Sequence, residues 1–469
     1  MNVLLINTNM AEGYKKLKNL SGFAPPVGLA YIASFLEKNN IKVKIIDANA
    51  LSLTDKELKK ILHSIDFDII GTTAFTSTIK RAFNVLKMAK ELKACTTVIG
   101  GAHATALPIE TLDNIFLDIV VKGEGEVTFL EIVKTLRANR SLKGVKGIYY
   151  KNNGKIISTP ERPLIENLDE LPFPAYHLLP MKKYKISNHH AVGHGRKINL
   201  HPFFIIFTSR GCPFNCTFCA SHLTWKRRVR YRSPENVIKE IDFLVKNYNV
   251  KNIDFYDDTF TLDKKRMNRI LDLIIQRNYD INFACLSRVD SIDDEILSKL
   301  NRAGFYNIRY GIESGSPEIL KRMRKGIDLE KARKAIRLTQ KHKMSANAFF
   351  IFGHPGETKE TAMQTINFAL KSNPDFALFF NAIPLPGTDM AKMVENQLIN
   401  KNSITITSQK AAFDTDELTK KEIIAIRGKA YRKFYLRPSF ILKKLLKIRS
   451  LTELKIYMTA AASFIGLIK

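Results

Sequence analysis

The chain has 469 residues, of which 45% are hydrophobic and 25% charged, a composition that predicts roughly two to four folded domains and excludes a disordered or multi-spanning membrane protein. Lys and Arg total 74 against 45 Asp and Glu, so the formal net charge of +29 suggests nucleic acid, a membrane surface or a phosphorylated substrate as a partner. The first residues, MNVLLINTNM, form too short an apolar run for a secretory signal, and we therefore expect a cytoplasmic protein.

Short runs rich in β-branched residues alternate with helical patterns over residues 1–140, which is typical of βαβ units in a parallel sheet. Strands are predicted at 2–7, 42–47, 68–73, 96–100 and 117–121, and helices at 27–39, 55–64, 78–93 and 126–138. Together they predict a five-stranded, flavodoxin-like, doubly wound sheet whose ligand lies beyond the carboxyl ends of the strands. Those ends carry small and polar residues, namely Thr72, Thr73, Ser77, Gly100, Gly101, His103 and Thr105.

Residues 141–200 are predicted to be a linker with a β-hairpin that turns at Asn153 and Gly154. A second alternating series over residues 201–390 predicts an incomplete (β/α)6 barrel, with its chemistry on the loops at the carboxyl ends of the strands. Its strands are expected at 203–208, 252–256, 281–286, 306–311, 347–352 and 376–380, and its helices at 234–248, 263–277, 292–303, 328–343 and 358–372. Residues 391–469 break this pattern and are predicted to be a basic, mainly helical region.

Three of the five cysteines follow the first predicted barrel strand: Cys212, Cys216 and Cys219. Their close spacing and the odd total argue against a disulfide framework and favour a metal site in a reducing compartment. Three thiolates can hold three irons of a cubane cluster and leave the fourth iron open to a substrate. The alternative is a structural zinc site with His222 as fourth ligand, although such sites usually draw on two separated pairs of ligands. Cys95 and Cys285, at or inside predicted strands, are expected to be buried and inert.

The cysteines lie in the run TSRGCPFNCTFCA, and five further motifs follow it in order along the barrel region: RYRSPENVIKEI, FYDDTFT, RYGIESGS, FIFGHPGET and IPLPGT. With the Cys-x3-Cys-x2-Cys spacing, they resemble the radical S-adenosylmethionine (SAM) superfamily, in particular the subgroup that carries a cobalamin-binding domain ahead of the barrel. The segments PPVGLAYIASFLE, GGAHATALP and KGEGEVTF are similar to that domain, so the resemblance covers about residues 1–400. It implies a 4Fe-4S cluster on the three cysteines, cleavage of SAM to a 5′-deoxyadenosyl radical, and cobalamin as a further cofactor.

By this resemblance, residues at the carboxyl ends of the barrel strands are candidates to bind SAM: Phe218, Asp257, Asp258, Arg288, Glu313, Ser314, Gly353 and Gly356. Carboxylates and hydroxyls can accept hydrogen bonds from the ammonium and ribose groups, and glycines let the backbone approach the adenosine. A purely structural role stands beside each of these. It is a core aromatic for Phe218, a surface side chain for Arg288, a helix cap for the carboxylates and hydroxyls, and a tight turn for the glycines.

The candidate cobalamin contacts lie at strand ends of the first domain: Thr72, Ser77, Gly100, Gly101 and His103. Some cobalamin-binding domains place a histidine below the cobalt from an Asp-x-His-x-x-Gly motif after the first strand. Here that loop reads NTNMAE and has no histidine, as is common in the subgroup resembled. This predicts either cobalamin without a protein histidine on the cobalt or a degenerate domain that binds none. His103 is expected to touch the corrin or its tail, or to cap a loop.

The positive charge is concentrated at the end of the chain, where residues 420–469 hold 13 Lys and Arg against two Asp and Glu. The last apolar run is too short to span a bilayer. Three predictions remain open for this region: an ordinary helix packed on the barrel, an amphipathic helix on an anionic membrane, and an RNA-binding segment. Nucleic acid is the least favoured partner, because the single tryptophan, Trp225, lies outside this region.

These features predict a radical SAM enzyme that acts on an unactivated carbon of a hydrophobic small molecule of lipid, isoprenoid or tetrapyrrole type. The reaction is methyl transfer from methylcobalamin, or radical oxidation, cyclisation or coupling, with ferredoxin or flavodoxin as the electron donor. The alternatives are an RNA-modifying radical SAM enzyme and a non-catalytic protein that holds zinc or a corrinoid.

Overall fold

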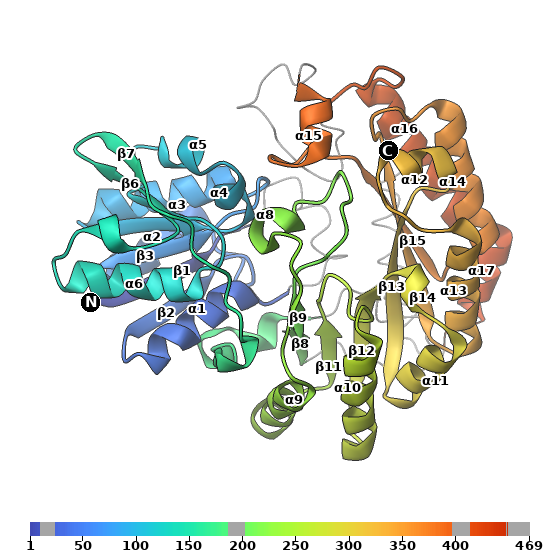
Figure 1. Ribbon diagram of the computed structural model, residues 1–469, viewed down its shortest axis with the longest axis horizontal. Coiled ribbons are helices and arrows are strands. Elements are labelled where there is room, and N and C mark those ends of the chain that lie inside the picture. Colours follow the sequence, from blue (N-terminus) through green and yellow to red (C-terminus); the bar gives the residue numbers. More distant parts are fainter. Residues whose placement is uncertain (10–23, 186–201, 396–412, 447, 449–469) are drawn as a thin grey trace. The chain divides into compact units, whose positions relative to one another are not determined.

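The computed structural model describes residues 1–9, 24–185, 202–395, 413–446 and 448, and Figure 1 follows the chain through them. These residues fall into two compact units. The first unit comprises residues 1–9, 25–184 and 220–230. The second comprises residues 24, 185, 202–219, 231–395, 413–446 and 448.

The first unit is built on a seven-stranded sheet with the order β2-β1-β3-β4-β5-β6-β7. Its strands are β1 (Asn2–Asn7), β2 (Lys42–Asp47), β3 (Ile69–Thr73), β4 (Thr96–Gly100), β5 (Ile119–Val121), β6 (Ile148–Asn152) and β7 (Lys155–Ser158). The first five are parallel in the flavodoxin-like order, which confirms the predicted fold class. The expected five strands are too few, because the hairpin turning at Asn153 and Gly154 adds β6 and β7 antiparallel to β5.

Helices cover both faces of this sheet (Figure 1): α1 (Val27–Lys38) and α6 (Glu126–Arg137) on one, and α2 (Asp55–Ser64) and α3 (Ile79–Leu92) on the other. The alternation of side chains along β1 explains the two cores. Val3 and Leu5 pack toward α1 and α6, while Leu4 and Ile6 pack toward α2 and α3. Two short helices that the sequence did not predict, α4 (Ala102–Ala106) and α5 (Pro108–Leu112), lie between β4 and β5.

The second unit contains a six-stranded, all-parallel sheet with the order β15-β14-β13-β12-β11-β8. The strands are β8 (Phe203–Ile206), β11 (Asn252–Phe255), β12 (Asn282–Ser287), β13 (Phe305–Glu313), β14 (Ser345–Phe352) and β15 (Phe376–Asn381). The helices between them are α9 (Pro234–Tyr248), α10 (Lys264–Arg277), α11 (Asp294–Arg302), α12 (Pro317–Arg322), α13 (Leu329–Lys341) and α14 (Lys359–Ser372). This confirms the predicted partial barrel, with α12 as an addition.

Five barrel helices start where the sequence places a capping side chain. The caps are Ser233, Asp263, Asp293, Asp328 and Thr358, and each accepts a hydrogen bond from a backbone N–H in the first turn. Such a bond satisfies one of the four N–H groups that a helix start leaves without an intrahelical partner. The caps therefore fix the length of the loops that follow the strands, which is where the candidate site lies.

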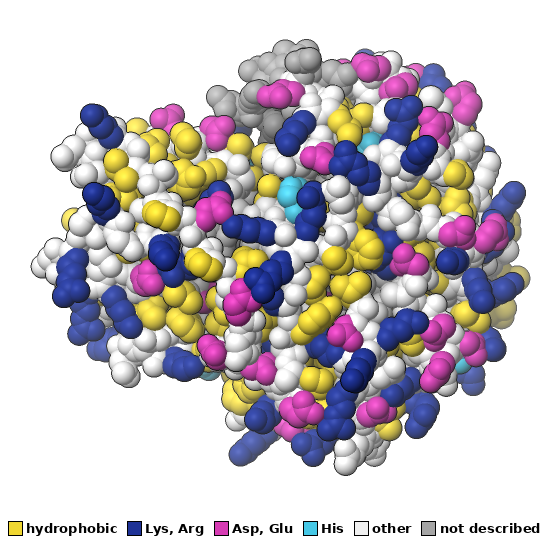
Figure 2. All heavy atoms as spheres, viewed as in Figure 1, with side chains coloured by type: hydrophobic (Ala, Val, Ile, Leu, Met, Phe, Trp, Pro, Cys, Tyr) yellow, Lys and Arg dark blue, Asp and Glu magenta, His cyan; other side chains and the backbone are white. Residues whose placement is uncertain are grey.

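Three helices follow the barrel: α15 (Asp389–Met393), α16 (Lys420–Tyr435) and α17 (Pro438–Leu445). The predicted amphipathic segment beyond residue 448 lies outside the described residues. Among those described, no helix is long and apolar enough to cross a membrane. On the face drawn in Figure 2, Lys and Arg side chains are scattered and interspersed with Asp and Glu.

Candidate functional site

The three cysteines lie on the loop that follows β9 (Ser209–Arg210) in the second unit, and all three are half-buried. Asp257 at the end of β11 fixes the start of this loop. Its buried carboxylate accepts hydrogen bonds from the backbone N–H groups of Thr208, at 2.6 Å, and Ser209, at 2.8 Å. Burial raises the pKa of Asp257, and these hydrogen bonds oppose that shift. Asp257 thus orders the chain that leads into the cysteine loop.

Thr217, between the second and third cysteines, fixes the middle of the loop. Its N–H donates to the carbonyl of Met323 at 3.0 Å, and its carbonyl accepts from the N–H of Met390 at 2.9 Å. Its hydroxyl lies 2.9 Å from Nε2 of His354, which is fully buried. Because Nδ1 of His354 contacts the carbonyl of Pro355 and burial lowers the histidine pKa, the neutral ring accepts the Thr217 proton at Nε2. The end of α12, the helix α15 and the turn after β14 therefore hold one residue of the cysteine motif.

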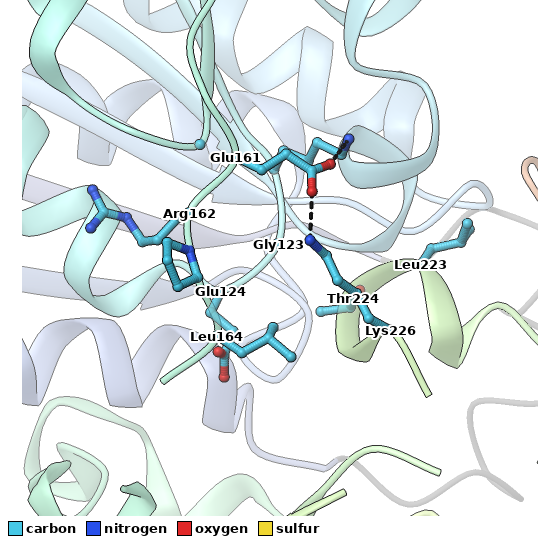
Figure 3. Close-up of a pocket in the computed structure, with 11 residues that line it drawn as sticks. Gly123, Glu124, Glu161, Arg162, Leu164, Leu223, Thr224 and Lys226 are labelled. Atoms are coloured by element: carbon cyan, nitrogen blue, oxygen red, sulfur yellow. Dashed lines mark hydrogen bonds and ion pairs between the residues drawn. The ribbon is translucent and has the colours of Figure 1, made fainter. Parts of the chain in front are cut away.

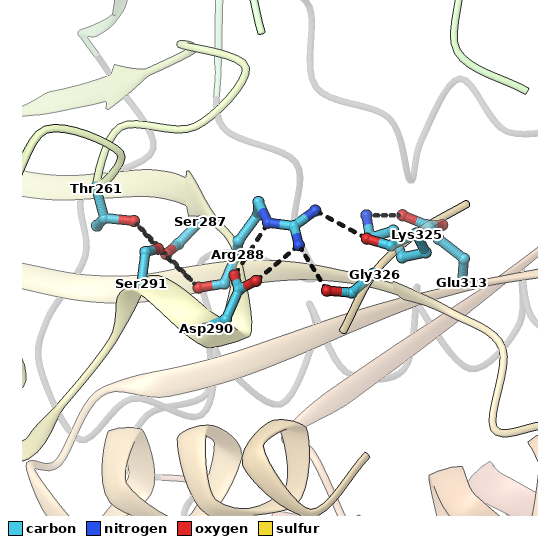
Figure 4. Close-up of polar contacts among 8 residues, drawn as sticks. All are labelled: Thr261, Ser287, Arg288, Asp290, Ser291, Glu313, Lys325 and Gly326. Atoms are coloured by element: carbon cyan, nitrogen blue, oxygen red, sulfur yellow. Dashed lines mark hydrogen bonds and ion pairs between the residues drawn. The ribbon is translucent and has the colours of Figure 1, made fainter. Parts of the chain in front are cut away.

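Two buried cations, Arg288 and Lys325, lie beside the cysteine loop, and Figure 4 shows their polar partners. The Arg288 guanidinium is 3.6 Å from the ring centroid of Phe214, pairs with Asp290, and donates to the carbonyls of Lys325 and Gly326. The Nζ of Lys325 lies 2.8 Å from Oε1 of Glu313. Burial raises the pKa of the Cys216 thiol, and the Lys325 and Arg288 charges oppose that shift. The cysteine loop thus lies beside two ion pairs, Arg288 with Asp290 and Lys325 with Glu313.

The other residues predicted to bind SAM differ in their exposure, backbone conformation and hydrogen bonds. Asp258 is exposed, and its charge adds to the effect of burial in raising the pKa of Cys212. Glu313 has the left-handed backbone φ of +70°, which is unusual for a residue with a side chain and points to a site where local strain is maintained. The hydroxyl of Ser314 is buried 3.0 Å from that of Thr365 in α14. Arg288 is not the surface side chain allowed for above, since it is only 6% exposed.

Phe218 and the two glycines lie where packing explains them. Phe218 packs against the apolar cluster of Ala382, Met390, Val394 and Phe413. Gly353 and Gly356 have φ of +88° and +87°, and a Cβ on Gly353 would come within 2.8 Å of the Ile423 side chain. The turn after β14 therefore requires glycine at both positions for backbone reasons alone.

Glu357, in the same turn, is fully buried and accepts the N–H of Gly353, while its Oε1 has no hydrogen-bond partner among the described residues. Burial raises its pKa from about 4.5 to about 8. The folded chain thus holds a proton that the unfolded chain releases, so stability falls as the pH rises from 4.5 through 8. We expect Glu357→Gln to unfold like the wild type at pH 5 but to be more stable at pH 8, by up to about 4 kcal/mol. Parallel urea titrations of the two proteins at both pH values measure this, and equal differences at pH 5 and 8 contradict it.

In the first unit, hydrogen bonds join the loops after β3 and β4. The N–H of Ala74 donates to Gly100 and that of His103 to Ala74, at 2.9 and 3.1 Å. Gly101 has a φ of +98°, and its Cβ would collide with Thr73 and Ala74. Thr72 is buried and donates to the carbonyl of Ile6, whereas Ser77 is half-buried. The predicted cobalamin residues are therefore brought together at one sheet edge.

This edge has two features that fit cobalamin, one polar and one apolar. Nδ1 of His103 is buried and has no hydrogen-bond partner among the described residues, and burial lowers the histidine pKa so that the ring is neutral. Phe75, which the sequence analysis missed, is 63% exposed at the same edge. A neutral hydrogen-bonding group and an exposed ring suit a large ligand with an apolar macrocycle and polar amide arms. Residues 7–9 of the loop that lacks histidine are described, and 10–12 lie outside.

The helix α8 (Ser221–Trp225) and the residues that follow it are fastened to the first unit. Glu161 pairs with both Lys122 and Lys226 across a pocket that Leu223 and Thr224 also line (Figure 3), and these partners lower its pKa to about 2. Deeper in the unit, Nη1 of Arg230 lies 2.8 Å from Oε2 of Glu124, and the two side chains are 3% and 2% exposed. Residues 220–230 of the first unit, directly after Cys219, are thus held by side chains from the loops after β5 and β7.

In the part of the chain that the structure describes, no three His, Cys, Asp or Glu side chains converge where they could hold one metal ion. A zinc site requires such convergence. A cubane cluster does not, because each thiolate binds a different iron. His222, the fourth ligand of the zinc alternative, belongs to α8.

A doubly wound ligand-binding unit joined to a partial barrel with a three-cysteine loop defines a cofactor-dependent radical enzyme class. Residues 206–369 match the family model of the radical SAM superfamily, and residues 17–133 match that of the B12 binding domain. The chain is 40% identical over 447 residues to an uncharacterized methyltransferase of Pyrococcus horikoshii, covering 94% of each chain. It therefore belongs to the B12-binding radical SAM superfamily and is a radical SAM enzyme with a 4Fe-4S cluster, SAM and cobalamin as cofactors.

Other relatives agree with this assignment. The chain is 29% identical to the anaerobic magnesium-protoporphyrin IX monomethyl ester cyclase of Rubrivivax gelatinosus, over 94% of this chain and 78% of that one. Among solved structures, the cobalamin-dependent SAM radical enzyme OxsB matches 99% of this chain and 72% of its own with a TM-score of 0.74 at 20% identity. The methyltransferase TsrM of Kitasatospora setae matches 84% of this chain and 75% of its own, at a TM-score of 0.68 and 17% identity. These structures confirm the fold, and the family excludes the non-catalytic zinc alternative.

Proposed function

We propose that the protein is a cobalamin-dependent methyltransferase that adds a methyl group to an unactivated carbon of a hydrophobic small molecule of lipid, isoprenoid or tetrapyrrole type. The observation that carries this proposal is the 40% identity, over 94% of both chains, to a relative named as a methyltransferase. A cytidylyl-2-hydroxyethylphosphonate methyltransferase and a bacteriochlorophyllide methyltransferase are also among the relatives, at 29% and 24% identity.

In this proposal Cys212, Cys216 and Cys219 hold the cluster, and Lys325 and Arg288 balance its charge. When bound, the cluster and one SAM would supply a 5′-deoxyadenosyl radical, and cobalamin, remethylated by a second SAM, would supply the methyl group. The candidates to orient SAM are Phe218, Asp257, Asp258, Arg288, Glu313, Ser314, Gly353 and Gly356. Asp258 is the strongest of the carboxylates, because it is exposed whereas Asp257 is buried on backbone N–H groups. A ferredoxin or flavodoxin would deliver the electron.

For cobalamin, we propose that His103 donates or accepts a hydrogen bond on the corrin or its tail and that Thr72, Ser77, Gly100 and Gly101 shape the edge of its site. The unpartnered Nδ1 of His103 supports this role. Since the described part of the loop after β1 offers no histidine, the cobalt would have no protein ligand from it.

The test is to incubate the reconstituted enzyme with methyl-deuterated SAM, a reductant and a cell extract, and to analyse the extract by mass spectrometry. We expect a hydrophobic compound to gain a deuterated methyl group. The same mixture with a Cys216→Ala variant is the control and should show no such product. A product that loses two hydrogens without gaining the label contradicts methyl transfer.

That second outcome would favour oxidative cyclisation, the other reaction class predicted for this chain. Its support is the 29% identity to the magnesium-protoporphyrin cyclase over 94% of the chain. Both reactions start from the same three cysteines and the same radical. The labelled methyl group therefore distinguishes them within one experiment.

A further inference from the structure

The helix α17 is packed with its apolar side chains outward. Four of them share one side and are exposed: Ile441 (43%), Leu442 (59%), Leu445 (55%) and Leu446 (77%). On the other side Lys444 is buried, with Nζ 4.0 Å from the ring centroid of Phe376, and Phe440 packs on Phe434 and Tyr435. A helix that only covered the barrel would bury its leucines and expose its lysine. Packing on the barrel therefore does not explain why the outer side of α17 carries exposed apolar side chains.

The apolar exposure is concentrated in this place. Fifteen large hydrophobic side chains are exposed among the described residues, and five of them fall within residues 436–446, with Leu436 as the fifth at 59%. Single exposed hydrophobic residues are normal on a protein surface, but a contiguous group marks an interaction site. We call the four exposed side chains of residues 441, 442, 445 and 446 the α17 surface.

The charge around the α17 surface indicates what it binds. Residues 423–448 contain eight Lys and Arg and no Asp or Glu. Lys429, Arg432 and Lys433 on α16 are exposed. A stretch that combines exposed leucines with cations and no carboxylate is complementary to a layer with an apolar interior and anionic headgroups. A protein partner would more often be met by aromatic side chains and mixed charge.

The length of the helix decides how it would lie. Eight residues of α-helix measure about 12 Å, whereas the hydrocarbon core of a bilayer is about 30 Å thick. In agreement, no described helix can cross a membrane. The helix would thus lie along the surface, with its leucines at the boundary between headgroups and acyl chains.

We propose that the α17 surface, with the cations of α16, docks the enzyme on an anionic lipid bilayer. The inference rests on side-chain exposure and charge and is independent of the reaction proposed above. Binding of the protein to the bilayer would depend on both groups of side chains. The leucines supply the apolar contact, and the cations select anionic headgroups.

The experiment is co-sedimentation of the full-length protein with vesicles of phosphatidylcholine alone and of phosphatidylcholine with phosphatidylglycerol. We expect binding to the anionic vesicles, weakened about tenfold in the variant Leu442→Gln/Leu445→Gln/Leu446→Gln. An Arg432→Gln/Lys433→Gln variant should lose part of the preference for anionic vesicles. The matched control is Ile109→Gln/Ile115→Gln in the first unit, where the side chains are 57% and 80% exposed, and it should bind like the wild type.

Wild-type protein that fails to bind anionic vesicles overturns the proposal, as does a leucine variant that binds as well as the wild type. Sedimentation velocity of the same proteins without lipid tests the alternative partner of this surface, which is a second copy of the chain. If the leucine substitutions abolish a dimer and vesicle binding is absent, the α17 surface is an interface between copies of this chain. Because the replaced side chains are exposed, equal melting temperatures should show that the variants are folded.

Discussion

A Cys216→Ala variant is expected to lose its iron–sulfur cluster and all measurable cleavage of SAM. Each cysteine of the loop would hold one iron of the cubane, so two remaining thiolates cannot retain it. Cys216 also precedes Thr217, which Met323, His354 and Met390 hold in place, and lies near the Lys325 and Arg288 cations.

The measurements are iron and sulfide content after anaerobic reconstitution and release of 5′-deoxyadenosine by chromatography. The wild type should hold about four irons and four sulfides per chain, and the variant should release at least about a thousandfold less deoxyadenosine. Cys95→Ala is the matched control, since Cys95 is only half-buried and lies in the first unit, before β4. Full iron content in the Cys216→Ala protein would mean that the cluster is held elsewhere.

Local sequence signals predicted most of the fold. The barrel helices α9 and α14 have the bounds expected within a residue, because capping residues such as Ser233 and Thr358 mark where they start. The hairpin of β6 and β7 was found from its Asn-Gly turn, but its pairing with β5 was not. Pairing joins residues far apart in the sequence, and nothing local to the hairpin encodes it. The five-residue helices α4 and α5 are too short to show a helical period.

In the candidate site, too, local sequence patterns could be recognised and long-range contacts could not. The cysteines could be found because their spacing is a local pattern, whereas the groups that hold their loop could not. Thr217 meets His354 across 137 residues, and Arg288 stacks on Phe214 from a different strand end. Lys325 was missed because its only local signal is a Lys-Gly turn after α12. Cys285 is fully buried as expected, while Cys95 is only half-buried because it lies just before β4, not inside it.

The ion pair between Arg230 and Glu124 shows how tertiary contacts of this kind can be tested. Glu124→Ala is expected to destabilise the first unit by about 3–5 kcal/mol, because it leaves the Arg230 guanidinium buried without its counter-ion. Nε and Nη2 of Arg230 already have no hydrogen-bond partner among the described residues, so little else could take over. The same carboxylate accepts the N–H of Ile165 at 2.7 Å, and that bond would be lost too.

The single tryptophan of the chain makes this effect directly visible. Trp225 lies in α8, and the Arg230 guanidinium is 5.6 Å from its ring centroid, so its fluorescence reports on the segment that the ion pair anchors. In urea, the fluorescence transition of Glu124→Ala should come well before that of the wild type. The matched control is Glu166→Ala, which removes an exposed pair with Arg228 and should change the free energy of unfolding by less than about 1 kcal/mol. Coincident transitions for the two variants would show that the buried pair does not anchor the segment that follows Cys219.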